Sequence, residues 1–206
     1  EWPQRLRGGK LQAGEYTPAA ERYHQYAQWL AEEQLQSLAA KKEAGGAGLY
    51  LDFPLGVHPQ SYDVWRERDV FALEASAGAP PDTLFTKGQN WSFPPLHPEA
   101  LRRKGYSYWI ESLRRQFQYA SAVRIDHVMG LHRLFWIPQG REAKDGVYVH
   151  YRPEELYAIV CLESHRSKTA VVGENLGTVP AEVNHEMERR GLQPMYVLQY
   201  EARPDA

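Results

Sequence analysis

The stretch AVRID, residues 122–126, decides the fold, because it is a short apolar segment that carries charged side chains at its end. A segment of this kind predicts a buried strand that ends in functional groups. Two similar segments, LYLDF at 49–53 and AVVG at 170–173, lie before and after it, and a fourth, MYVLQY, occupies 195–200. The sequence therefore predicts four short strands.

Segments with helical spacing separate these strands. The first is an amphipathic helix that begins at Thr17, a capping residue, with Pro18 in the first helical position, and continues to about Gly45. Three further helices are predicted: around 109–117, over 153–168 and from Pro180. Alternating helices and strands indicate parallel β–α–β units. Such units form either an open doubly wound sheet or an eight-stranded barrel, and periodicity does not choose between them.

One long segment interrupts this alternation. Between Gly56 and Tyr106 the chain is rich in Pro, Gly and aromatic residues and has no sustained period. We expect a long loop there, and loops of this length in compact domains are usually functional.

Composition narrows the class of partner. The net charge is −2, and the Lys and Arg residues are scattered, so neither nucleic acid nor an anionic membrane is expected as a partner. No apolar run approaches the roughly 20 residues needed to span a bilayer. The single cysteine, Cys161, fits a reducing compartment, and we expect a cytoplasmic protein. The histidines form no pair with metal-ligand spacing, so no metal or other cofactor is expected.

Charged residues lie in or at the ends of the predicted strands, where an unpaired charge is costly. They are Asp52, Arg124, Asp126 and Glu174. Functional groups of parallel folds collect where strands end. Arg124 and Asp126 are two residues apart on one strand, so they should share a face. A guanidinium beside Asp126 favours the ionised carboxylate that a nucleophile requires.

Glu174 ends the next predicted strand. Because neighbouring strands are about 4.8 Å apart, its carboxyl group is expected about 5 to 5.5 Å from that of Asp126. This separation suits a retaining glycosidase-type reaction with one nucleophile and one general acid/base. A structural salt bridge of Arg124 with either acid explains the same residues, and spacing alone does not decide between the two interpretations.

Several longer motifs point to a known family. They are GAPPD at 78–82, GQNW at 88–91, RIDHVMGLHRLFWIP at 124–138, VVGENLGTVP at 171–180 and MYVLQYE at 195–201. Together they resemble the amylomaltases, the 4-α-glucanotransferases of glycoside hydrolase family 77. The motifs occur in family order from about Gly48 onward, and the RIDH and GENLG segments are the most specific.

The resemblance implies an α/β fold, namely a partial (β/α)8 barrel of the TIM type with about four parallel strands and flanking helices. Residues 1–206 are then the central part of the catalytic barrel, residues 1–45 its leading helix, and residues 56–106 a long loop region of the substrate groove. A complete barrel needs about 250 residues. The family's third essential carboxylate, on a later strand, is expected beyond Ala206.

The resemblance also implies roles for single residues. Asp126 matches the nucleophile, Glu174 the general acid/base and Arg124 the partner of the nucleophile. Residues expected to bind substrate are Asp52, Gln89, Asn90, Trp91 and His127. Two positions depart from the usual pattern, since Ser92 replaces a glycine and Asn175 replaces an aspartate.

The expected activity is the transfer of α-1,4-glucan segments between malto-oligosaccharides by a double displacement, without a cofactor. One alternative is a retaining α-glucan hydrolase, in which water is the acceptor and only shorter products form. Another is a catalytically incomplete fragment that binds glucans and turns nothing over.

Overall fold

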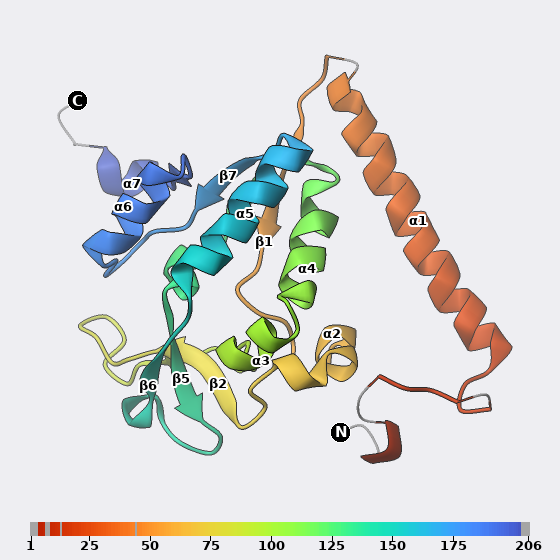
Figure 1. Ribbon diagram of the computed structural model, residues 1–206, viewed down its shortest axis with the longest axis horizontal. Helices are drawn as coiled ribbons and strands as arrows, with labels where there is room; N and C mark the ends of the chain where they lie inside the picture. The colour runs from red at the N-terminus through yellow and green to blue at the C-terminus, as the bar shows by residue number, and fades with distance from the viewer. Residues whose placement is uncertain (1–3, 7–8, 13, 44, 203–206) are drawn as a thin grey trace.

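The computed structural model describes residues 4–6, 9–12, 14–43 and 45–202 (Figure 1). One of its two sheets is parallel, with the order β1-β4-β7-β8. Its strands are β1 (Leu49–Phe53), β4 (Ala120–Ile125), β7 (Ala170–Gly173) and β8 (Gln193–Pro194). The predicted α/β fold with four parallel strands is therefore confirmed.

Helices cover one face of this sheet. They are α4 (Ser107–Phe117) and α5 (Pro153–Ser167), which pack against each other, while α6 (Ala181–Arg189) connects β7 to β8. Along β4 the side chains alternate between the two faces, so that Val123 and Ile125 are buried in the main core whereas Arg124 faces the other way. The core also contains Leu113 and Val160, both fully buried.

The second sheet is antiparallel, with the order β3-β2-β5-β6. Its strands are β2 (Ala75–Ala79), β3 (Gln89–Asn90), β5 (Arg133–Pro138) and β6 (Val147–His150). The expectation of a long loop over 56–106 was thus wrong in its secondary structure, because this segment also holds α2 (Tyr62–Arg66) and α3 (Pro98–Arg103). Strand β2, ASAGA, shows no apolar alternation. Gly78 must be small, since a Cβ there would lie 2.1 Å from the carbonyl oxygen of Gln89.

Helix α1 (Pro18–Glu43) begins where the sequence predicts, and the Thr17 hydroxyl accepts a hydrogen bond from the amide of Ala20 at 3.2 Å. Its apolar side chains are not buried, however, and α1 stands apart from the other helices (Figure 1). Tyr23, Tyr26 and Trp29 are 69%, 60% and 53% exposed. The contacts of α1 with the rest of the fold include those of Glu32, which accepts hydrogen bonds from Arg115 and Tyr119. Within the described ranges, no helix has the length and apolar character needed to cross a membrane.

The fourth strand lies earlier than predicted. β8 covers only Gln193–Pro194, and the run 195–200 instead turns into the short helix α7 (Leu198–Glu201). β8 pairs with β7 only at Val172 and Gly173, where β7 ends. Among the residues that the structure describes, no strand lies beside the apolar run that follows, and Tyr196 is 68% exposed. An apolar run needs a partner strand as well as propensity to become a strand.

Candidate active site

Three charged side chains meet on the face of the parallel sheet opposite the helices. Arg124 donates one hydrogen bond to Asp52 and one to Asp126, each at 2.7 Å. Asp52 and Arg124 are register partners on β1 and β4, and Asp126 lies two residues further along. Burial opposes the charge of Arg124, but its hydrogen bonds to Asp52 and Asp126 and their negative charges together outweigh burial and raise the pKa of this guanidinium. The arrangement holds both carboxylates at the carboxyl ends of their strands.

Glu174 is fixed against the turn that follows β4. Its carboxylate accepts hydrogen bonds from the backbone amides of His127 and Leu176, both at 2.9 Å. Its own amide donates to the carbonyl of Ile125 at 2.9 Å, and its carbonyl accepts from the amide of Val128 at 3.0 Å. Glu174 therefore contacts the residue directly after Asp126, and the two predicted catalytic residues belong to one hydrogen-bonded unit.

His127 connects this unit to the second sheet. The residue has a left-handed backbone with φ of 48°, and its ring contacts the Trp91 ring edge-to-face with centroids 5.2 Å apart. Burial lowers the pKa of His127, although the negative charges of Glu174 and Asp126 oppose this shift. The imidazole is therefore neutral near pH 7, with the capacity to donate one hydrogen bond and accept another.

The predicted substrate residues after β2 divide into two groups. Trp91 lies against His127, and its indole N–H donates to the side-chain carbonyl of Gln89 at 3.2 Å. The side chain of Asn90 instead accepts hydrogen bonds from the Ser76 hydroxyl at 2.7 Å and the Ser92 amide at 2.9 Å. Asn90 thus builds the turn that presents Trp91.

Ser92 occupies a backbone conformation that favours glycine, with φ of 62°. Ser92→Gly is therefore expected to stabilise the protein by about 1 kcal/mol or less, because the relief of strain outweighs the added freedom of the unfolded chain. Urea unfolding measures this change. The matched control, Ser112→Gly in helix α4, is expected to destabilise. If Ser92→Gly loses as much stability as the control, the backbone at Ser92 is not strained.

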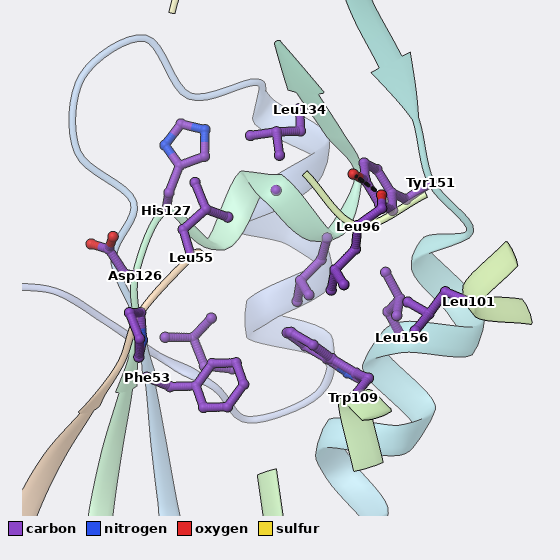
Figure 2. A pocket seen from close by; sticks show the side chains of 14 residues that line it. Phe53, Leu55, Leu96, Leu101, Trp109, Asp126, His127, Leu134, Tyr151 and Leu156 are labelled. Atoms are coloured by element: carbon purple, nitrogen blue, oxygen red, sulfur yellow. Dashed lines mark hydrogen bonds between the residues drawn. The ribbon is translucent and has the colours of Figure 1, made fainter. Parts of the chain in front are cut away.

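A cavity of about 40 Å³ lies behind the site, on the side of the helices. Apolar side chains such as Phe53, Trp109 and Leu156 line it, and Asp126 lies at its edge (Figure 2). Figure 2 shows the carboxyl group of Asp126 directed away from these side chains. Such a volume holds a few water molecules at most. A ligand larger than a few water molecules would therefore have to reach Asp126 from the polar face, where Arg124 lies.

His132 lies at the end of the turn that follows β4, and it is only 8% exposed. Its Nε2 atom lies 3.3 Å from the Tyr157 hydroxyl, and burial lowers the pKa of His132. The charged groups around it are Glu182, Glu154, Arg190 and Arg133. The unfolded chain takes up a proton near pH 6.5. Because the pKa of His132 is lower in the folded chain, protonation below about pH 6.5 favours the unfolded chain. The free energy of unfolding should therefore fall as the pH drops below about 6.5.

Urea unfolding at pH 7.5 and 5.5 checks this expectation. His132→Gln should narrow the difference in the free energy of unfolding between the two pH values. If His132→Gln loses as much stability on acidification as the parent chain, the buried imidazole is not responsible.

Sequence reasoning missed the role of Met195. Its sulfur accepts a hydrogen bond from Nε of Arg124 at 3.5 Å, and its amide donates to the side-chain oxygen of Asn175 at 3.1 Å. No local pattern indicates these contacts, because they depend on where β8 ends. Among the described residues, no group of three or more His, Cys, Asp and Glu side chains is placed to hold a metal ion.

A parallel sheet with acidic side chains where its strands end is typical of β/α enzymes, both barrels and doubly wound sheets. The sequence matches the family model described as 4-alpha-glucanotransferase, glycoside hydrolase family 77, over residues 1–206. The chain belongs to this family.

Individual relatives agree with this assignment. The 4-alpha-glucanotransferase of Haemophilus influenzae is 44% identical over 178 residues, which are 85% of this chain and 26% of that protein. The Thermus thermophilus 4-alpha-glucanotransferase is 32% identical over 86% of this chain and 37% of its own length. The crystal structure of the Corynebacterium glutamicum amylomaltase superposes with a TM-score of 0.86 at 33% identity, covering 96% of this chain and 29% of that one. The chain thus spans between 26% and 37% of the length of these relatives.

Proposed function

We propose that the chain supplies the nucleophile and the general acid/base of a 4-α-glucanotransferase. The observation that carries the proposal is the hydrogen-bonded unit in which Arg124 holds Asp126 while Glu174 accepts from the amide of the next residue, His127. Family membership supports α-glucans as the substrate class, and the substrates proposed are malto-oligosaccharides and other α-1,4-glucans.

In the proposed reaction, a carboxylate oxygen of Asp126 attacks the anomeric carbon of the donor glucan. Glu174 donates a proton to the departing glycosidic oxygen, which leaves with the reducing-end part of the donor. The resulting glycosyl ester is then attacked by a hydroxyl group of an acceptor sugar, whose proton returns to Glu174. Two inversions at the same carbon retain the α configuration. Arg124 supports this chemistry because its guanidinium donates a hydrogen bond to the Asp126 carboxylate at 2.7 Å and holds it in place.

An aromatic ring beside the site is suited to contact a sugar. Trp91 lies beside His127, and aromatic rings present flat apolar faces that complement the C–H faces of sugar rings. His127 is proposed to exchange a hydrogen bond with a sugar hydroxyl. Gln89 and Asn90 hold the turn that carries Trp91, and Asp52 is held by Arg124 on the parallel sheet.

The test uses a graft, defined as the Haemophilus influenzae relative with its matching segment replaced by this chain. The graft is incubated with maltotriose, and the products are separated by chain length. A ladder of longer oligosaccharides together with glucose is the expected result. Circular dichroism verifies that the graft folds, and the Corynebacterium glutamicum amylomaltase serves as recipient if it does not.

The two alternatives give other results. A folded graft that forms only shorter sugars is a hydrolase and contradicts glucan transfer. A folded graft without turnover, together with maltotriose binding by the 206-residue chain, identifies a glucan-binding fragment and overturns the catalytic proposal.

A further inference from the structure

The carboxyl end of β7 carries a polar contact that the proposed chemistry does not use. The side chain of Asn175, directly after Glu174, accepts a hydrogen bond from the Met195 amide at 3.1 Å and donates one to Asn184 on α6 at 2.9 Å. Asn175 therefore connects the ends of β7 and β8 to the helix between them. We propose that Asn175 is a positioning residue for the two catalytic carboxylates.

Asn175 is connected to Asp126 through Met195 and Arg124. Its amide is held from two sides, by the Asn175 side chain and by the carbonyl of Gly173 at 3.2 Å. Its sulfur contacts Arg124, whose guanidinium in turn holds Asp126 at 2.7 Å. Met195, directly after β8, therefore helps to orient Arg124, and the hydrogen bond from its amide to Asn175 holds Met195 in place.

Asn175 transmits its effect toward Glu174 along the backbone. The Glu174 carboxylate accepts from the amide of Leu176, the residue that follows Asn175. A rotation of the peptide groups around residue 175 moves this amide, and the carboxylate of Glu174 moves with it. The same side chain thus acts on both ends of the proposed catalytic pair without touching the sugar.

The chemistry of residue 175 is specific. The position needs an acceptor for the Met195 N–H and a partner for Asn184. A carboxamide supplies both, and a leucine of similar shape supplies neither. An aspartate keeps the acceptor and can accept from the Asn184 amide after that group turns over. Rescue by aspartate therefore distinguishes hydrogen bonding from simple space filling.

The first experiment follows backbone amides by NMR in the 206-residue chain, at neutral pH. Asn175→Leu is expected to speed hydrogen exchange of the Met195 amide about tenfold, as for the loss of one hydrogen bond, and to shift the Leu176 amide resonance. Asn175→Asp should restore the parent exchange rate to within about twofold. Asn184→Ala, which leaves the Met195 bond in place, should produce a smaller change in the same direction.

Unchanged Met195 exchange in Asn175→Leu would overturn the proposal, and so would an aspartate variant as defective as leucine. If the leucine variant does not fold, the comparison of Asn184→Ala with the parent decides, and equal exchange rates count against the proposal. These readouts do not require catalysis, so they stand apart from the assay of the graft.

The second experiment rests on the proposed function and uses the graft. Asn175→Leu is expected to lower kcat about tenfold while KM changes less than about twofold, because the residue orients catalytic groups rather than binding sugar. A rise in KM at constant kcat would assign Asn175 to substrate binding and refute a positioning role. Failure of the parent graft to transfer glucan counts against the proposed function alone.

Discussion

Asp126→Asn is expected to reduce maltotriose disproportionation by the graft by a factor on the order of 10⁴ or more. An amide at this position is a poor nucleophile and cannot form a stable glycosyl ester. The amide oxygen can still accept the hydrogen bond from Arg124, whose guanidinium lies 2.7 Å from the Asp126 carboxylate in the parent chain. The site should therefore keep its shape while it loses its chemistry. Initial rates of glucose release, with the products resolved by chain length, measure the effect.

Asp52→Asn is the matched control for this variant. Asp52 is also a carboxylate held by Arg124 at 2.7 Å, so its replacement removes the same kind of ion pair. We expect a loss of about tenfold, as for a residue that supports binding without reacting. Equal losses in the two variants would show that Arg124 needs both partners and that Asp126 has no special role. Undiminished products from Asp126→Asn would refute its assignment as nucleophile.

The second large effect concerns stability. Leu113 on α4 is fully buried in the main core, so Leu113→Ala should lower the free energy of unfolding by about 2–5 kcal/mol. The loss combines the transfer of the removed methyl groups to water with the cavity that they leave. Urea unfolding of the 206-residue chain, followed by tryptophan fluorescence, measures the change.

Leu162→Ala provides the comparison, because Leu162 lies on the neighbouring helix α5 and is 49% exposed. Its removal should change the free energy of unfolding by less than about 0.5 kcal/mol. Similar small losses for both variants would mean that α4 does not pack on the parallel sheet in solution.

The parts of the fold that the sequence predicts are those with a local cause. Strand β4 and the meeting of Arg124 with Asp126 follow from the two-residue period of a strand, and the start of α1 follows from Thr17 and Pro18. Strand β2 has no such cause, because it shows no apolar alternation and its Gly78 is required by the close approach of a neighbouring strand, which the sequence does not reveal. The end of β8 is set by the length of β7, which no property of the run 195–200 reveals.

The candidate site divides in the same way. The acidic and basic side chains could be named from their places in the strands and from the family motifs. The donors to Glu174 could not, because they are the backbone amides of His127 and Leu176, and every residue except proline has such a group. Which amides converge on a carboxylate depends on the shape of the turn, including the left-handed conformation of His127.

The attachment of α1 through Glu32 makes this helix a lever. About 14 residues, or roughly 21 Å of helix, separate that contact from Pro18. A tilt of only about 10° around Glu32 would therefore carry the first turn through about 4 Å, while the atoms at the contact barely move. A fluorophore placed near the exposed Tyr23 would magnify small rearrangements at Arg115 and Tyr119 into a readable displacement. The first turn of α1, which is far from the contact at Glu32, is therefore the place where a small movement at that contact is easiest to detect.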